Sequence, residues 1–258
     1  IAMPKLTQTL GPWIKYPKDQ KYTNKLSHEK EIMTKLIEQL PKYDSFIQNF
    51  HYDITNWLPF YWKGFSQTTR YTYILENIQD LEAIGKDFKS SKRKNISKAG
   101  KILDVKFDLS ARDFYDNHKM TLEQEGSKIS YSWELFKNLY NQAYTHNSGK
   151  TIYAVDKKGN IHSALFIVWN NISAYDLIST IDHRFRNSGS ATYLVWKMLE
   201  YLSNNKIVSK FDFEGSMIEG VENSFRAFGA KQTPYFQVYK HTSIPYRIMH
   251  SANILLKR

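Results

Sequence analysis

The chain has 258 residues, 41% of them hydrophobic and 15% aromatic, which is enough apolar material for one large folded domain or two small ones. It has no cysteine, so disulfides and cysteine-ligated zinc are excluded, and no apolar run approaches the roughly 20 residues of a membrane-spanning helix. The net charge of +11 favours anionic partners such as nucleotides, nucleic acid or a membrane surface, although a solvated lysine-rich surface gives the same charge. No secretory signal is recognisable, so a cytoplasmic protein is expected.

The first third of the chain is predicted to alternate extended and helical segments. Ser27 is placed to cap a helix, with Glu29 and Glu31 in its first turn on the favourable side of the helix dipole. Pro41 ends that helix. The other expected elements are extended chain at 1–16, a strand at 45–52, a short aromatic helix or turn at 54–65, a strand at 67–75, and a basic helix or pair of helical turns at 81–101.

The rest of the chain predicts a regular succession of strands and helices. One helix is marked by Val195, Met198, Leu199 and Leu202, which recur at the helical period. Residues 157–160 form a hairpin-turn signal between two strands. The expected elements are, in order, a strand at 102–109, helices at 113–125 and 133–144, strands at 150–156, 161–169 and 175–181, the helix just described, a strand at 208–214, a helix at 217–228 and a strand at 235–241.

A short basic loop, residues 183–191, joins the strand at 175–181 to the next helix. The first turn of that helix leaves backbone N–H groups without partners, and together with the helix dipole they favour a phosphate group. Arg184 and Arg186 can add charge-assisted hydrogen bonds, and Gly189 has no Cβ that would keep a phosphate away. We therefore expect Gly189→Val to weaken binding of the phosphate-bearing ligand while leaving the fold intact. The alternative is an ordinary strand–helix loop with solvated arginines.

Within this loop, Arg186-x-x-Gly189-x-Ala191 resembles the Arg/Gln-x-x-Gly-x-Gly/Ala signature of the GNAT acyltransferases. The succession of elements between 102 and 241 is similar to the GNAT order as well. The resemblance implies that the loop holds the pyrophosphate of acyl-coenzyme A (acyl-CoA). The residues implied in this contact are Arg184, Arg186, Asn187, Ser188, Gly189, Ser190 and Ala191.

The first part of the chain looks like an incomplete copy of the same unit, because its elements follow one another as those of the last part do. A tandem pair of GNAT-like domains is the arrangement of the FemAB-like aminoacyltransferases and of their coenzyme-A-using relatives. The resemblance implies a mixed α+β fold with two lobes, each built on a mixed central sheet flanked by helices. The expected divisions are a first lobe at 1–80 that lacks its opening strands, a basic helical connector at 81–101 and a GNAT acyltransferase domain at 102–258.

Acyl transfer to an amine requires a bound acyl donor, a deprotonated amine and stabilisation of the oxyanion. The resemblance places the acyl group where the strands at 175–182 and 208–214 part, with backbone N–H groups of the first strand as oxyanion donors. At the end of the second strand, Glu214 is the first choice for the base that takes the proton of the amine. The further candidates, each with an orienting or surface role as the alternative, are in order Asp212, Asp182 and His183.

The sequence departs from the GNAT pattern at one position. Many GNAT enzymes have a tyrosine four residues before the glycine that ends the next helix, and this tyrosine protonates the leaving thiolate. Here the matching pattern is Phe225-x-x-x-Gly229. Phenylalanine has no proton to give, so the leaving group must depart as a thiolate or find another proton donor.

The segment between residues 50 and 71 is dense in aromatic side chains and polar groups. Such a mixture suits a sugar or a nucleoside base, which needs ring stacking and several hydrogen bonds, although an aromatic core explains it equally well. The residues expected to contact the substrate are His51, Tyr52, Trp62, Gln67, Arg70 and Tyr71.

These features predict a monomeric N-acyltransferase, without a metal, that moves an acyl group from acyl-CoA to a small amine. Resemblance to the acyltransferases of bacterial surface-polysaccharide pathways implies a nucleotide-linked amino sugar as the acceptor. One alternative is a FemAB-like enzyme that transfers an aminoacyl group from tRNA to a peptidoglycan precursor. The positive charge suits tRNA, but the loop at 183–191 favours coenzyme A. A second alternative is a non-catalytic nucleic-acid-binding module, for which no motif is recognisable.

Overall fold

The computed structural model describes residues 1–215 and 217–255, and its contacts divide the chain into two compact units. Unit 1 comprises Ile1–Tyr71 and Thr233–Arg258, and unit 2 comprises Thr72–Gln232. This division falls elsewhere than the expected lobe boundaries. The interpretation of the first lobe as an incomplete repeat stays a prediction.

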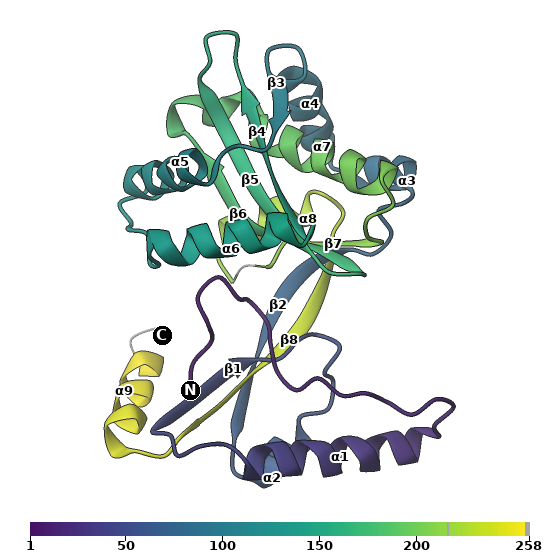
Figure 1. Cartoon of the computed structure of the whole chain (residues 1–258), viewed down its shortest axis with the longest axis vertical. Helices are drawn as coiled ribbons and strands as arrows, with labels where there is room; N and C mark the ends of the chain where they lie inside the picture. The colour runs from purple at the N-terminus through teal and green to yellow at the C-terminus, as the bar shows by residue number, and fades with distance from the viewer. Residues whose placement is uncertain (216, 256–258) are drawn as a thin grey trace. The chain divides into compact units, whose positions relative to one another are not determined.

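The strands and helices confirm the predicted mixed α+β class (Figure 1). The strands are β1 (Ser45–Asn49), β2 (Ser66–Leu75), β3 (Asp104–Phe107), β4 (Gly149–Val155), β5 (Ile161–Trp169), β6 (Ser173–Ile181), β7 (Lys210–Asp212) and β8 (Lys231–His241). The helices are α1 (Tyr22–Glu38), α2 (Leu58–Trp62), α3 (Leu81–Asp87), α4 (Ser90–Ala99), α5 (Ala111–Gln124), α6 (Trp133–Thr145), α7 (Ser190–Asn204), α8 (Glu219–Arg226) and α9 (Ile244–Leu255), with a 3-10 turn η1 (His183–Ser188).

Hydrogen bonds join the strands in the order β1-β8-β2-β7-β6-β5-β4-β3. The sheet is mostly antiparallel, and β6 and β7 are the parallel pair among the registers that the structure gives. β2 and β8 each contribute residues to both units, and the end of β2 pairs with β7 inside unit 2.

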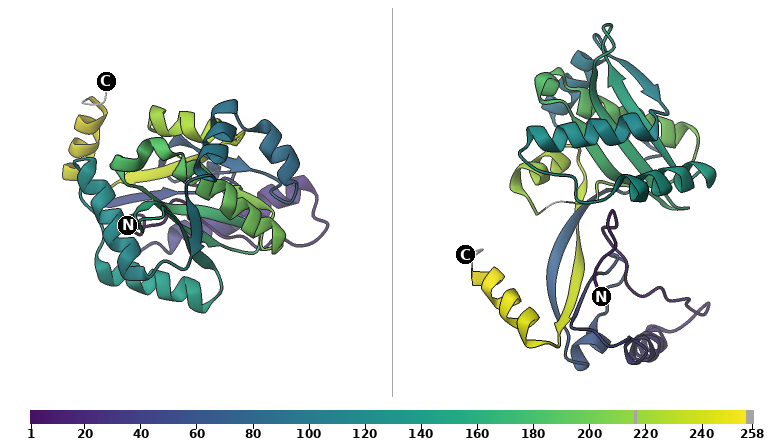
Figure 2. Two further views of the ribbon diagram at one scale, coloured as in Figure 1. Left: turned by 90° about the horizontal axis from the view of Figure 1, so that it is seen from above. Right: turned by 60° about the vertical axis from the view of Figure 1, so that its left-hand side comes forward.

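In unit 2, helices cover both faces of the sheet formed by β3 to β7 (Figures 1 and 2). α5 and α6 lie on one face, and α3, α4 and α7 lie on the other. Phe114 of α5 and Phe136 of α6 stack at 5.7 Å between ring centroids, and both rings pack against Phe166 of β5. On the opposite face the predicted stripe of α7 is confirmed, because all four of its apolar side chains are buried.

In unit 1, β1 pairs antiparallel with β8, and α1 and α2 pack on each other. The buried core contains aromatic rings in edge-to-face contact, with centroids 5.2 Å apart for Phe46 and Phe65 and 5.0 Å apart for Phe50 and Phe60. Its buried members are Ile14, Met33, Phe46, Phe50, Phe60, Phe65 and Val238.

Several element predictions need correction. The prediction that Ser27 caps a helix was wrong: α1 begins at Tyr22, and the Ser27 hydroxyl donates to the carbonyl of Thr23 inside the helix. No helix breaker lies between Pro17 and that point, so the helix extends further back than the cap signal indicated. The basic segment at 81–101 forms two helices, α3 and α4, which agrees with the predicted pair of helical turns, whereas α9 was not predicted.

Candidate functional site

β6 and β7 share a short parallel pairing within unit 2. Their parallel pairing covers Ser173 to Tyr175 of β6, opposite Lys210 to Asp212 of β7. β6 then continues to Ile181, while β7 ends at Asp212. Among the residues that the structure describes, the pairing of β6 with β7 goes no further than Tyr175.

A bulge in β6 lies directly after the point where the strands part. Asp176 pairs with Ile167 and Ile178 pairs with Phe166, so Leu177 is the extra residue. A bulge of this kind re-aims the side chains around it. As a result the Ser179 hydroxyl lies 2.9 Å from both carboxylate oxygens of Asp176, a residue that sequence reasoning missed. The available signal was an acidic residue in the middle of a strand that has no other charged residue.

The end of β7 holds two further carboxylates. Asp212 is 3% exposed and accepts hydrogen bonds from the Thr72 hydroxyl and, at 2.8 Å, from the backbone N–H of Glu214. The second bond forms because Glu214 and Gly215 both have left-handed backbone conformations, with φ of 54°, which end the strand and turn the chain back. The carboxyl group of Glu214 has no hydrogen-bond partner among the residues that the structure describes.

Burial raises the pKa of all three acids, and at Glu214 the charges of the other two raise it further. Burial raises the pKa of Asp176 to about 7 and that of Asp212 to about 6. Burial, with the negative charges of Asp212 and Asp176, raises the pKa of Glu214 to about 8. Glu214 is thus an unpaired carboxyl group with a pKa near neutral pH, which is the property expected of a general base.

Asp182 and His183 lie at the start of η1. Asp182 is almost fully buried and forms a bidentate ion pair with Arg184, in which Arg184 Nη2 lies 2.6 Å from Asp182 Oδ2. Asp182 also accepts a hydrogen bond from the side-chain amide of Gln124. The hydrogen bonds from Arg184 hold the pKa of Asp182 below its usual range. His183 lies 3.6 Å from Glu125. Their role as alternative bases stays a prediction, and the low pKa of Asp182 makes it a weaker base than Glu214.

In the loop at 183–191, some of the groups predicted to bind a phosphate have no partner among the described residues, and others are already engaged within the protein. The N–H groups of Ala191 and Thr192 at the start of α7 have no partner among the described residues, and Arg186 is exposed. Arg184, by contrast, is engaged by Asp182. Ser188 and Ser190 are buried, and the Ser190 hydroxyl has no partner among the described residues. These groups fit one phosphate at the start of α7.

The structure requires glycine at position 189 because of its backbone conformation and its contact with α4, which is not the reason predicted. Its φ is +83°, and a Cβ at this position would lie 2.7 Å from the carbonyl oxygen of Asn95 in α4. The space beside Gly189 is therefore filled by α4 and is not open to a ligand. The expectation that Gly189→Val leaves the fold intact is wrong on this geometry, because the added side chain would collide with backbone.

The residues expected to contact the substrate all belong to unit 1. The ring centroids of His51 and Tyr52 lie 3.9 Å apart with the rings tilted by 36°, and Trp62 is exposed below the ammonium group of Lys30. Tyr71 is half-buried on β2. Gln67 Oε1 and Arg70 Nε are buried without a hydrogen-bond partner among the described residues, which is costly unless a ligand or water completes them.

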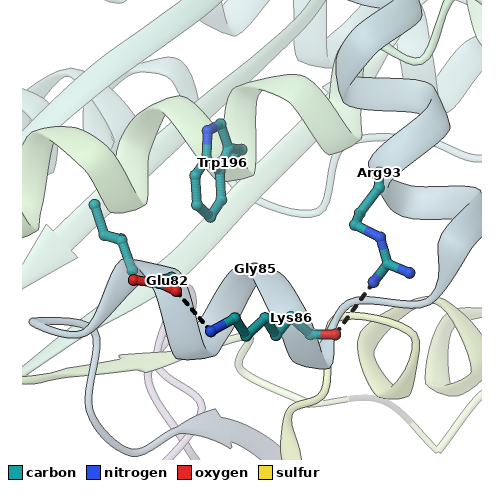
Figure 3. A pocket seen from close by; sticks show the side chains of 6 residues that line it. Glu82, Gly85, Lys86, Arg93 and Trp196 are labelled. Atoms are coloured by element: carbon teal, nitrogen blue, oxygen red, sulfur yellow. Dashed lines mark hydrogen bonds and ion pairs between the residues drawn. The ribbon is translucent and has the colours of Figure 1, made fainter.

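A separate pocket of about 540 Å³ lies between α3, α4 and α7 (Figure 3). Trp196 forms one wall, Lys86 pairs with Glu82 at 2.6 Å, and Arg93 donates to the carbonyl of Lys86. None of the predicted site residues lines it. Among the described residues, no cluster of three or more acidic or histidine side chains is arranged to hold a metal ion, and no helix is long and apolar enough to cross a membrane.

Comparison with known proteins shows which solved structures share the fold of this chain. The sequence matches no family model and no curated protein. The structure is similar to FemX, with a TM-score of 0.65 and 15% identity over 84% of this chain and 77% of FemX. It is also similar to L-PGS from Bacillus licheniformis (TM-score 0.58, 8% identity, 78% and 69% of the two chains) and to a tandem GNAT protein from the clavulanic acid biosynthesis pathway (0.50, 11%, 86% and 70%). Identities this low show a shared fold, and that fold is the GNAT-like one predicted.

Proposed function

We propose that the protein is an acyltransferase that moves an acyl group to a primary amine in the opening between β6 and β7. One observation carries this proposal: three desolvated carboxyl groups, Asp176, Asp212 and Glu214, meet where the parallel pairing of these strands ends. Burying several acids together is costly unless a cation visits them. An ammonium group is such a cation.

The chemistry follows from the state of each group. An amine reaches the site mostly as ammonium at neutral pH, and its nitrogen can attack only after losing a proton. The carboxylate form of Glu214 takes this proton, while Asp212, held by Thr72 and the Glu214 N–H, orients the turn. The unpaired N–H groups of β6 near the bulge at Leu177 stabilise the oxyanion that forms on the acyl carbonyl.

For the donor, the first candidate is acyl-CoA. The N–H groups of Ala191 and Thr192 and the exposed Arg186 would hold one phosphate of its pyrophosphate. The acceptor would be the amine of a nucleotide-linked amino sugar for surface polysaccharide. The buried, unsatisfied atoms of Gln67 and Arg70 support a polar ligand in unit 1. A cytoplasmic monomer would suit such small substrates.

A second candidate donor is aminoacyl-tRNA, with a peptidoglycan precursor as acceptor. The observation in its favour is α4, which fills the space beside Gly189 and places Lys98 Nζ 2.7 Å from the carbonyl of Asn187. This leaves less room for a pyrophosphate and adds positive charge beside the loop. A non-catalytic nucleic-acid-binding module is the third reading, but it gives no reason for buried carboxyl groups.

The test is acyl transfer with matched variants. Purified protein is assayed with acetyl-CoA, longer acyl-CoAs and aminoacyl-tRNA against amino-sugar nucleotides and peptidoglycan precursors. Glu214→Gln should lower turnover by roughly 10²-fold or more, with donor affinity little changed. The deficit should shrink at high pH, where free amine is present without a base. Glu219→Gln, an exposed carboxylate at the start of α8, is the control. Wild-type turnover in Glu214→Gln at neutral pH would remove Glu214 from the mechanism.

A further inference from the structure

Helix α8 lacks the phenol that many GNAT enzymes use as the acid. Phe225 stands at this position, and its ring stacks on Phe213 at 4.9 Å between centroids. Phe213 directly follows the end of β7, so this part of α8 lies beside the opening between β6 and β7. A leaving group in that opening has no proton donor at position 225.

Ser224, the residue before Phe225, forms a hydrogen-bonded pair with Lys92. The Ser224 hydroxyl accepts a hydrogen bond from Lys92 Nζ at 2.8 Å, and the same ammonium group lies 4.0 Å from the ring centroid of Phe228. An ammonium group has three N–H bonds. One is used by Ser224 and one faces the ring, so the third has no partner among the described residues.

Lys92 also connects this point to the loop that would hold the donor. It lies on α4, whose Asn95 packs on Gly189 and whose Lys98 donates to Asn187 of η1. α4 therefore runs from the donor loop at one end to α8 at the other. A donor held at the loop, with its acyl group in the opening, would extend its leaving atom along this helix.

We infer that Lys92 is the acid that protonates the leaving group, held in place by Ser224 and replacing the phenol that Phe225 lacks. This inference rests on the proposed acyl transfer. As the tetrahedral intermediate collapses, the bond from the acyl carbon to the leaving sulfur or oxygen breaks, and its electron pair stays on that atom. The atom takes a proton from Lys92 Nζ, and the resulting neutral amine regains a proton from water.

The electrostatics of the pair suit this role. Burial lowers the pKa of Lys92 to about 8, so its ammonium form predominates at neutral pH and gives up a proton more readily than an ordinary lysine. The charged residues that flank Ser224 on α8, Glu222 and Arg226, pair with each other at 2.9 Å. Of the neighbouring positive residues, Lys89 precedes α4 and Arg93 donates a hydrogen bond to the carbonyl of Phe88.

The experiment compares pH profiles of acetyl transfer from acetyl-CoA for wild type, Lys92→Met and Lys92→Arg. We expect Lys92→Met to lose roughly 10²-fold in turnover. In wild type, turnover should fall on the alkaline side as Lys92 loses its proton. Lys92→Arg keeps the positive charge, but its guanidinium group does not give up a proton in this pH range, so it should lose most of the turnover as Lys92→Met does. Lys94→Met, an exposed lysine on the same helix, is the matched control.

The possible failures can be told apart. Wild-type turnover in Lys92→Met or in Lys92→Arg overturns the role of Lys92 as the acid while the proposed function stands. A wild-type protein that transfers no acyl group from any donor overturns both. Should Lys92→Met fail to fold, as a thermal melt would show, the profile of Lys92→Arg decides alone.

Discussion

Unit 1 and unit 2 differ in how completely they bury their side chains. Unit 2 has helices on both faces of its sheet, and aromatic rings such as Phe114 and Phe136 are fully buried between the layers. Unit 1 has a small buried core and exposes several large apolar side chains to water. Among them are Trp13 at 82% exposure, Tyr22 at 72% and Ile244 at 69%.

This difference in burial bears on which unit can hold buried acids and which can bind a ligand at its surface. The core of unit 2 holds Asp176 and Asp212 out of water, and because burying acids lowers stability, the surrounding packing has to offset this cost. Unit 1 combines exposed aromatic groups with buried polar atoms that lack partners, as at Gln67 and Arg70, which suits a surface that binds a ligand.

Core truncations test this contrast with the largest expected effect. Phe136→Ala in unit 2 and Phe46→Ala in unit 1 should each cost about 3–5 kcal/mol of unfolding free energy, because each opens a cavity among packed rings. Hydrogen exchange measured by mass spectrometry reports the two units separately. We expect Phe46→Ala to expose the amides of α1 and β1 and to leave β4 and β5 protected. Equal loss of protection in both units would show that they unfold together.

A glycine substitution tests the packing of α4 in unit 2. Gly189→Val combines a left-handed backbone with a collision against Asn95, so it should cost about 3 kcal/mol. Gly126→Val is the matched control, since Gly126 also has a positive φ of +72° but open space around it. Its cost should be nearer 1 kcal/mol. Chemical denaturation measures both, and equal losses would show that α4 does not pack tightly on the loop.

The pH dependence of stability tests the buried carboxyl groups. Folding raises the pKa of Asp176 to about 7 from an unfolded value of about 3.9, so the folded state binds more protons between these values. Its contribution is therefore present below pH 4 and lost as pH rises through 7. Wild type should lose about 2 kcal/mol or more between pH 5 and pH 8, and Asp176→Asn should lose less. Thermal melts across this range decide, with the exposed Asp104→Asn as control. Parallel curves for wild type and Asp176→Asn would contradict the shift.

Much of the fold of unit 2 could be predicted from the sequence because its signals are periodic and local. The stripe of α7 and the strand that ends at Asp212 are examples. Asp176 could not be predicted, because its position depends on the bulge at Leu177, which a pairing register creates and a single strand does not show. The packing of Asn95 on Gly189 is equally non-local, so the sequence suggested a ligand where the structure has a helix.

The smallest expected effect concerns a buried carboxylate of unit 1. Glu29 is 5% exposed and accepts hydrogen bonds from the Tyr16 hydroxyl at 2.9 Å and from Asn56 at 2.8 Å. Glu29→Gln should cost about 1–2 kcal/mol, since charge-assisted hydrogen bonds are replaced by neutral ones. Glu31→Gln is the control and should have a much smaller effect, because its exposed carboxylate pairs with Lys35 on the same helix in water.

The titration of Tyr16 gives this prediction a second, local readout. Burial, together with the carboxylate of Glu29, raises the pKa of Tyr16 to about 12. In Glu29→Gln the negative charge is gone but the burial remains, so the pKa should fall without returning fully to its ordinary value. Nuclear magnetic resonance of labelled tyrosine follows this shift. A normal Tyr16 pKa in wild type would show that water reaches Tyr16 and Glu29. The core of unit 1 would then be more accessible to water than the core of unit 2.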